Sequence, residues 1–303
     1  MGDGDESYHN FNYPKLLHLY WDGSPLSYLN YLTILSFNEH HKDWKIIVYT
    51  PTTRTKAMSW KTQEHKHPYN GPCYFHKLHN IQNVTIQKVC LSEIGFDNDA
   101  PEVIKSDYLR YYVLQKHGGL WSDFDIIYTA SVEEKMNFNQ DVVIFKCITY
   151  NNPENKENEP GAFYYPVGLF LSKPNNKFFK FILEQCIEHY DGEYQSIGAS
   201  MFRALFPTDN EIFKIDNSIK ICNEEYYLPW AWNELDEFLN TKENILPLNN
   251  VGIHWFNGAY QSKQYAIDLE KRLKNFKVGC YLDKVIDKYI EPSKSVRPDF
   301  DNI

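Results

Sequence analysis

Short apolar runs alternate along the chain with longer segments in which apolar residues recur at helical spacing. A short continuous apolar run is typical of a strand buried on both faces, whereas apolar residues three and four apart are typical of an amphipathic helix. The predicted strands cover residues 15–20, 44–49, 84–89, 120–128, 142–148, 168–172 and 251–256, and a hairpin is predicted over 212–221. Strand, helix and strand at the start of the chain predict a right-handed βαβ unit with a parallel pair.

The predicted helices lie between and after these strands. The first has Ser24 as its N-cap and Pro25 as its first residue. The second opens on a capping box formed by Asp99 and Glu102 and ends at Gly118-Gly119. Further helices are predicted over 175–190, 193–206, 262–277 and 281–290. Alternating strands and helices through the first half of the chain predict an α/β fold.

The composition and net charge of the chain exclude some classes of binding partner. The chain has 303 residues, 43% of them hydrophobic, which is enough for a sizeable core. Its net charge of −9 comes from 40 acidic and 31 basic residues, and it lacks the cationic surface that nucleic acids and anionic membranes require. The six cysteines show neither C-x-x-C nor Cys/His ligand spacing, so no structural zinc is expected.

The sequence carries no obvious targeting segment. Residues 1–6 are polar and acidic, unlike a signal peptide, and no apolar run reaches the ~20 residues of a membrane-spanning helix. We therefore expect a cytoplasmic protein, and a luminal one only if an anchor lay upstream of this sequence.

The residues with most chemical meaning stand on the second predicted helix and the strand after it. Asp123 and Asp125 are two residues apart at a strand end, so both carboxylates project to one face while Phe124 packs on the other. Converging carboxylates repel unless a cation joins them, and open oxygen-ligand sites suit Mg²⁺ or Mn²⁺ shared with a phosphate. Asp107 and Arg110 share one face of the helix. We expect all four side chains to meet at the carboxyl ends of the strands, where open α/β sheets bind ligands.

Each pattern also has an ordinary structural explanation. A D-x-D sequence occurs by chance in many chains. An Asp/Arg pair three residues apart is usually an exposed ion pair, worth under about 1 kcal/mol. The combination of the helix, the Gly-Gly break and the Asp pair at the strand end favours a binding site.

Two runs of residues resemble a known family. One is Ser106-Asp107-x-x-Arg110 followed by Gly118-Gly119-x-Trp121-x-Asp123-x-Asp125, and the other is Pro14-Lys15-Leu16-Leu17-His18-x-x-Trp21-x-Gly23. They resemble family 32-type glycosyltransferases, which carry a DXD sugar-binding region and are related to the sugar-transferring domains of large clostridial toxins. The resemblance is specific over about residues 14–50 and 101–128. It is weaker over 163–200 and 254–260, where Ala259 and Tyr260 replace a Ser-Trp pair.

The resemblance implies a GT-A type nucleotide-sugar-binding fold, with a mixed, mainly parallel central sheet flanked by helices. It implies a single domain over 1–303. Within it, 14–128 would be the nucleotide-sugar-binding half, 129–260 the acceptor-side half, and 261–303 the C-terminal helices and tail. It also implies a metal-dependent transfer, with retention, from a nucleoside-diphosphate sugar such as a UDP-sugar to a saccharide or glycoconjugate.

Site residues carried over from the resemblance have distinct roles. Trp21 and Asp22 would border the nucleoside, and Asp107 and Arg110 would hold the donor sugar and diphosphate. Asp123 would contact ribose or sugar, while Asp125 would bind Mn²⁺ or Mg²⁺. His254 and Asn257 would close the metal and diphosphate from the C-terminal side. An ordinary buried strand histidine is an equally good explanation of His254.

Two other classes of protein remain open. A different metal-dependent nucleotide-sugar enzyme, such as a hydrolase or nucleotidyltransferase, would use the same D-x-D pair, and a non-catalytic carbohydrate-binding protein would explain the aromatic content of 16%. On the acceptor side, the polar loop 151–161 is either idle surface or a lid over the acceptor, and its place near a strand end favours the lid. The aromatic residues expected to stack an acceptor sugar are Tyr164, Tyr165, Trp230 and Trp232.

Overall fold

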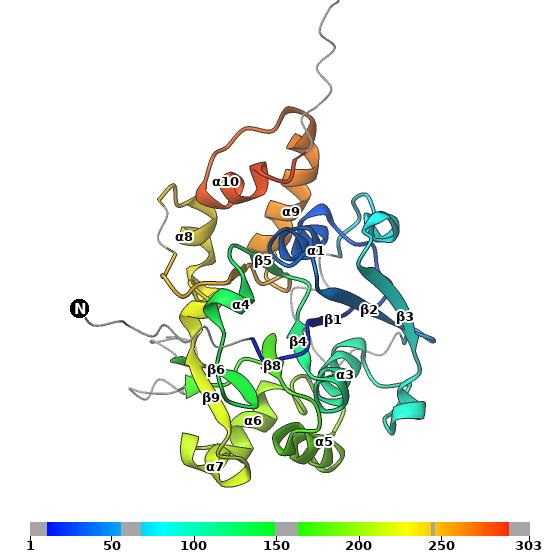
Figure 1. Ribbon diagram of the computed structural model, residues 1–303. Coiled ribbons are helices and arrows are strands. Elements are labelled where there is room, and N and C mark those ends of the chain that lie inside the picture. The colour runs from blue at the N-terminus through cyan, green and yellow to red at the C-terminus, as the bar shows by residue number, and fades with distance from the viewer. Residues whose placement is uncertain (1–10, 56–67, 149–162, 244–245, 291–303) are drawn as a thin grey trace, which may run out of the picture.

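A central mixed β-sheet organises the protein in the computed structural model, which describes residues 11–55, 68–148, 163–243 and 246–290 (Figure 1). The strand order is β3-β2-β1-β4-β8-β6-β7, with β9 paired to β6. The strands are β1 (Leu16–Tyr20), β2 (Lys45–Pro51), β3 (Val84–Val89), β4 (Gly119–Ser122), β6 (Val142–Ile148), β7 (Phe163–Tyr164), β8 (Leu169–Ser172) and β9 (Ile219–Asn223). The pairs β1–β2, β2–β3, β1–β4 and β6–β9 are parallel, whereas β4–β8, β6–β8 and β6–β7 are antiparallel. The expected mixed, mainly parallel sheet is confirmed.

A second, two-stranded sheet lies beside the first. In it β5 (Ile126–Tyr128) pairs antiparallel with β10 (Gly252–His254). The predicted strand over 120–128 is therefore two strands, β4 and β5, which belong to different sheets and are separated by a polar turn.

Helices cover both faces of the central sheet, as expected (Figure 1). They are α1 (Tyr28–His40), α3 (Glu102–His117), α4 (Val132–Lys135), α5 (Lys177–His189), α6 (Ala199–Leu205), α7 (Asp209–Ile215), α8 (Leu235–Asn240), α9 (Tyr260–Arg272) and α10 (Tyr281–Asp287). Two buried clusters fill the space between helices and sheet. Leu120 of β4 joins the cluster under α1, α9 and α10, and its neighbour Trp121 joins the one under α3, α5 and α6. This alternation is the period of a strand buried on both faces.

Helix α1 begins later than the sequence predicts. Its N-cap is Ser27, whose hydroxyl accepts from the backbone N–H of Asn30 at 3.1 Å. The N–H of Ser24 instead donates to Oδ1 of Asp22 at 2.8 Å, and its carbonyl accepts from the Trp21 indole at 2.7 Å. The expectation that Ser24 caps the helix and Pro25 starts it is wrong, because Ser24 is held in a turn that precedes the helix.

The predicted capping box of α3 is also wrong, whereas its end is confirmed. Pro101 occupies the N-cap position. The Glu102 carboxylate accepts from the Thr55 N–H at 2.7 Å and from Lys105 at 2.8 Å, so it is committed to tertiary contacts. The helix ends at His117, and Gly118 follows with a φ of 64° that glycine adopts without strain.

The predicted hairpin over 212–221 is wrong. Residues 212–215 complete helix α7, and only β9 is a strand. Ile212 and Ile219 both enter the buried cluster beneath α5, the first from a helix and the second from a strand that pairs parallel with β6.

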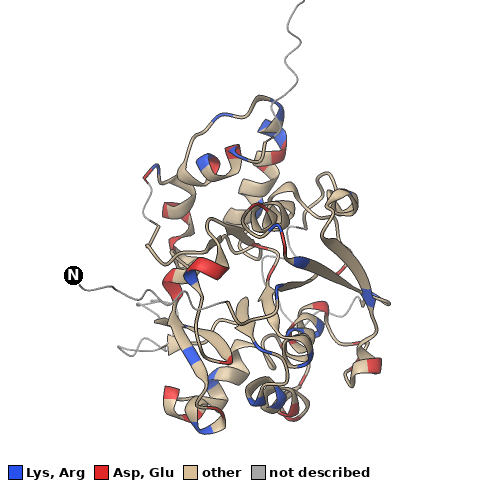
Figure 2. Cartoon of the chain, in the orientation of Figure 1, with Lys and Arg blue, Asp and Glu red and all other residues tan. Residues whose placement is uncertain are grey.

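Charged residues lie mainly on the outer helices and loops (Figure 2). Lys105, Asp107 and Arg110 on α3 are exceptions, because all three are buried. No helix in the described part of the chain is long and apolar enough to cross a membrane. The loop 151–161 lies outside the described residues.

Candidate active site

The turn between β4 and β5 carries the D-x-D pair. Its residues 123–125, the Asp turn, are fixed from two sides. The N–H of Asp123 donates to the carbonyl of Gly168 at 2.8 Å, and the carbonyl of Phe124 accepts from the Asn30 side chain at 2.9 Å. Phe124 is buried in the core cluster. The two carboxylates therefore share the opposite side, as the spacing predicts.

His254 completes a three-residue group with the D-x-D pair. Asp123, Asp125 and His254 each place one ligand atom within 4.8 Å of the others. The antiparallel pairing of β5 with β10 brings this about, because it sets His254 opposite Ile126. Nε2 of His254 lies 3.1 Å from Oδ1 of Asp125.

The group fits a divalent cation. Oδ1 of Asp125 is buried and forms an ion pair with the His254 imidazole, whose Nε2 lies 3.1 Å away. Because a metal-ligating imidazole must be neutral, a divalent cation would take the place of the imidazolium proton between these two side chains. Carboxylate oxygens suit Mg²⁺ and Mn²⁺ alike, and an imidazole ligand favours Mn²⁺ over Mg²⁺.

Burial and neighbouring charges shift the pKa values of Asp123, Asp125 and His254. Burial would raise the pKa of Asp125, but the nearby His254 and the Asn257 N–H outweigh it and lower that pKa. Burial would lower the pKa of His254, but the Asp125 carboxylate outweighs it and raises that pKa. Burial raises the pKa of Asp123 against the opposing effect of Arg110. Asp125 is therefore the most readily ionised member of the group.

Arg110 links α3 to the Asp turn. Its Nη2 lies 2.9 Å from Oδ1 of Asp107 and 3.2 Å from Oδ1 of Asp123, and its Nη1 donates to the carbonyl of Val167. The guanidinium also lies 5.2 Å from the ring centre of Trp121. Arg110 is only 3% exposed, so the ordinary explanation as an exposed ion pair is wrong. Burial raises the pKa of Asp107 to about 6, although Arg110 opposes that shift.

The remaining predicted site residues surround this centre at different depths. The half-buried Trp21 packs edge-on against Phe124, with ring centres 5.1 Å apart. Asp22 pairs with the exposed Arg54 at 2.8 Å. Asn257 contributes its backbone N–H, which donates to Oδ2 of Asp125 at 2.8 Å.

The aromatic residues expected to stack an acceptor sugar differ in exposure. Tyr165 is fully buried and donates to Asp209 at 2.6 Å, and Trp230 is buried against Phe238. The stacking expectation is therefore wrong for these two, because neither ring offers a free face. Trp232 is 56% exposed and keeps one.

Sequence reasoning missed two residues beside the Asp turn. A Cβ at Gly168 would lie 3.0 Å from Oδ2 of Asp123 and 3.7 Å from the Tyr227 ring. Gly168 begins the predicted strand 168–172, within the weaker part of the family resemblance, and Tyr227 stands at no motif spacing from the Asp pair, so neither is predicted as a site residue.

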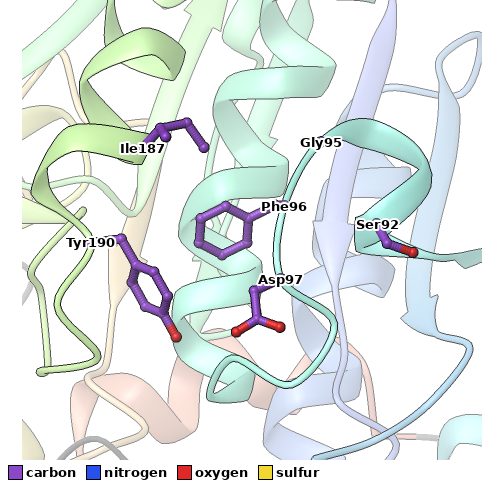
Figure 3. Close-up of a pocket in the computed structure, with 6 residues that line it drawn as sticks. All are labelled: Ser92, Gly95, Phe96, Asp97, Ile187 and Tyr190. Carbon is purple, nitrogen blue, oxygen red and sulfur yellow. The ribbon is translucent and has the colours of Figure 1, made fainter.

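An open hollow of about 270 Å³ lies away from this centre, between the 3₁₀ turn Leu91–Ile94 and the end of α5 (Figure 3). Its lining residues are Ser92, Gly95, Phe96, Asp97, Ile187 and Tyr190. It contains a single carboxylate and none of the predicted site residues, so it is not part of the candidate active site.

Several solved structures are similar to this chain at low identity. A structure described as PaToxG glycosyltransferase is 15% identical over 68% of this chain and 76% of its own, with a TM-score of 0.43. The galactosyltransferase LgtC, in complex with donor and acceptor sugar analogs, is 13% identical over 86% of this chain and 97% of its own, with a TM-score of 0.43. A 4-diphosphocytidyl-2C-methyl-D-erythritol synthase from Anaerococcus prevotii is 10% identical over 85% of this chain and 96% of its own, with a TM-score of 0.40. These scores do not assign any of the three activities to this chain.

The family of the chain comes from a match to a family model. No curated protein matches the sequence. The model described as "Capsular polysaccharide synthesis protein" matches residues 79–264, a span that contains α3, the Asp turn and β10. Since this span is more than half of the 303 residues, the chain belongs to the capsular polysaccharide synthesis protein family.

Proposed function

We propose that the protein is a metal-dependent glycosyltransferase of the GT-A type, which moves a sugar from a nucleoside-diphosphate sugar, a UDP-sugar, to a saccharide or glycoconjugate acceptor. The observation that carries the proposal is the meeting of Asp123, Asp125 and His254 beside the buried Arg110. Membership of a capsular polysaccharide synthesis family supports a saccharide acceptor. The resemblance of residues 106–125 to family 32-type glycosyltransferases supports the donor class.

Charge in the group favours a cation. Three carboxylates, those of Asp107, Asp123 and Asp125, face one guanidinium and one imidazole. When all five side chains are ionised they carry a net negative charge, which a divalent ion would offset. When bound, the ion would offset the negative charge that develops on the departing diphosphate as the anomeric bond breaks.

The chain's own residues divide the remaining work. Asp125 and His254 would hold the ion, while the Asn257 N–H fixes the orientation of the Asp125 carboxylate. Arg110 and Asp107 would hold the donor-sugar side, and Asp123 would contact ribose or sugar. Trp21 and Asp22, at the carboxyl end of β1, would border the nucleoside. This edge of a parallel sheet is where α/β folds bind nucleotides.

Retention of anomeric configuration is part of the proposal and rests on the family resemblance. The anomeric proton signals of the product, followed by NMR from the start of the reaction, test it directly.

A donor panel tests the function. The purified chain is incubated with nucleoside-diphosphate sugars of differing base and sugar, with Mn²⁺, with Mg²⁺ and with a chelator. We expect metal-dependent release of the nucleoside diphosphate, fastest with a UDP-sugar. Release of pyrophosphate from a nucleoside triphosphate and a sugar phosphate would identify a nucleotidyltransferase instead. Saccharide binding without turnover of any donor would identify a carbohydrate-binding protein.

A further inference from the structure

Tyr227 is a buried tyrosine that the proposed chemistry leaves unexplained. It follows β9 and the 3₁₀ turn Glu224–Tyr226, and it is 1% exposed. Its hydroxyl has no hydrogen-bond partner in the described part of the chain. Buried hydroxyls in native proteins are nearly always hydrogen-bonded, so this one calls for a partner that the chain itself does not supply.

The backbone around Tyr227 fixes the ring against the active site. Its N–H donates to the Glu224 carbonyl at 3.1 Å, and its own carbonyl accepts from the N–H of His254 at 2.8 Å. The ring packs edge-on against Phe145, with centres 4.9 Å apart, and also against the His254 ring at 6.0 Å. Tyr227 is therefore held beside the residue that completes the metal group.

Gly168 lies close to both the Tyr227 ring and Oδ2 of Asp123. A Cβ at Gly168 would contact Oδ2 of Asp123 at 3.0 Å and Cε2 of Tyr227 at 3.7 Å. Cε2 is bonded to the carbon that bears the hydroxyl, so the phenol end of the ring borders the glycine. The hydrogen bonds that Asp123 accepts from Arg110 and Trp121 both end on Oδ1. Oδ2 and the phenol thus flank one glycine, with the Asp123 side chain 32% exposed.

The phenol is available as a donor at any ordinary pH. A tyrosine phenol is protonated near neutral pH. The phenol and the carboxylate oxygen on either side of Gly168 therefore offer one donor and one acceptor. Neighbouring hydroxyls of a sugar ring present the complementary pair.

We propose that Tyr227 is a specificity-determining residue for the donor sugar. Its hydroxyl donates to one hydroxyl of the transferred hexose, and Oδ2 of Asp123 accepts from the neighbouring hydroxyl. Because Gly168 has no side chain, it leaves room for the sugar ring. This inference rests on the proposed function and adds to it the residue that reads the sugar rather than the nucleotide. A site built to hydrogen-bond a substrate hydroxyl discriminates strongly against analogues that lack it or present it elsewhere.

The experiment compares two substitutions that each remove a single buried hydroxyl. Tyr227→Phe removes the proposed sugar donor. Tyr13→Phe is the matched control, because the Tyr13 side chain is also buried but its hydroxyl donates to the Gln140 carbonyl at 2.8 Å, away from the Asp turn. Each variant is assayed for kcat/KM with UDP-glucose, UDP-galactose and UDP-N-acetylglucosamine, and for affinity for UDP with Mn²⁺.

For Tyr227→Phe we expect about a 10- to 100-fold loss of kcat/KM on the preferred donor, a smaller difference between glucose and galactose donors, and unchanged UDP affinity. Tyr13→Phe should leave all three quantities unchanged. Gly168→Ala should also lose the donor while keeping UDP, because the new Cβ occupies the sugar position.

Unchanged donor preference in Tyr227→Phe would overturn the inference. So would an equal loss of UDP affinity, which would place Tyr227 at the nucleotide. Wild-type protein that binds UDP but turns over none of a full donor panel would contradict the proposed function itself, and this inference with it.

Discussion

The backbone N–H of Asn257 donates to Oδ2 of Asp125 over 2.8 Å and so joins the segment after β10 to the Asp turn. This bond leaves Oδ1 of Asp125 to the His254 imidazole, whose Nε2 lies 3.1 Å away. One carboxylate oxygen is therefore committed to holding the fold, and the other faces the histidine with which it would share a cation. A substitution that tests metal binding by Asp125 should therefore keep the acceptor for the Asn257 N–H and remove only the charge.

Asp125→Asn should remove the metal effect on nucleotide binding and keep the fold. The amide oxygen can still accept from the Asn257 N–H, but the negative charge that favours the cation is lost. We expect Mn²⁺ to strengthen UDP binding at least about tenfold in the wild type, because the diphosphate oxygens complete a weak protein site, and to have no effect in the variant. Isothermal titration calorimetry with and without Mn²⁺ measures both.

Asp268→Asn is the matched control for this variant. Asp268 is an exposed carboxylate on α9 that pairs with Lys271. It should bind UDP and Mn²⁺ as the wild type does. An Asp125→Asn protein that retains the full metal effect would contradict the assignment of the metal to this group.

Removing Arg110 should destabilise the protein strongly. Arg110→Ala leaves the buried Asp107 without its partner and removes one contact to Asp123. Breaking a buried ion pair from one side costs about 3–5 kcal/mol of unfolding free energy. Arg110→Lys should cost less, since the charge remains but the planar fork that reaches both carboxylates and the Val167 carbonyl is lost.

Urea unfolding measures these losses, and Arg54→Ala provides the comparison. Arg54 also pairs with an aspartate, Asp22, but is exposed, so its removal should cost under about 1 kcal/mol. Equal costs for Arg54→Ala and Arg110→Ala would show that burial of the Arg110 pair does not matter.

The sequence predicts the strands better than it predicts the beginnings of helices. Strands such as β1 and β2 are largely buried on both faces, so their short apolar runs, interrupted in β1 only by the buried His18, are directly visible. The start of α1 is not visible in the same way, because Ser24 and Ser27 are both good caps. Only the bonds from Trp21 and Asp22 to Ser24 decide between them. The sequence does not show which residue makes such contacts.

The sequence likewise predicts some parts of the candidate site and not others. Asp107 and Asp123 stand on one helix and at the end of the next strand, so local geometry predicts that they approach each other. The burial of Arg110 comes with its contacts to Asp123 and to the Val167 carbonyl, and the spacing in the sequence does not show the second of these. Gly168 reaches the Asp turn beside the β4–β8 pairing, and Tyr227 reaches it through the bond from the His254 N–H to its carbonyl, and both contacts join distant segments.

Gly119→Ala should destabilise the connection between α3 and β4. Gly119 has a φ of 92°, and a Cβ there would lie 2.5 Å from the carbonyl oxygen of Leu16 in β1. The matched control is Gly192→Ala, because Gly192 has a φ of 86° but open space around its Cα. Both variants carry the strain of left-handed backbone. The overlap with β1 should add about 1–3 kcal/mol for Gly119→Ala alone, measured by urea unfolding. Equal losses would mean that β1 moves aside without cost.

Acid should destabilise the protein through His41 between about pH 6.5 and pH 4. Burial lowers the pKa of His41 to about 4. Its Nδ1 donates to the Phe37 carbonyl at 2.9 Å and its Nε2 accepts from the Val132 N–H at 2.8 Å, so the folded protein holds a neutral ring. The unfolded chain binds a proton below about pH 6.5 and the folded protein does not until about pH 4. The free energy of unfolding therefore decreases as the pH is lowered from about 6.5 to about 4, by about 3 kcal/mol for His41.

His41→Gln tests this origin of the acid sensitivity, because the glutamine amide can accept from Val132 without titrating. The difference in unfolding free energy between wild type and variant should shrink as the pH falls from 7 to 4, since only the wild type loses the His41 contribution. Other groups that titrate in the same window, Asp107 among them, are present in both proteins and cancel in the comparison. A pH-independent difference between wild type and His41→Gln would show that His41 titrates alike in the folded and unfolded states.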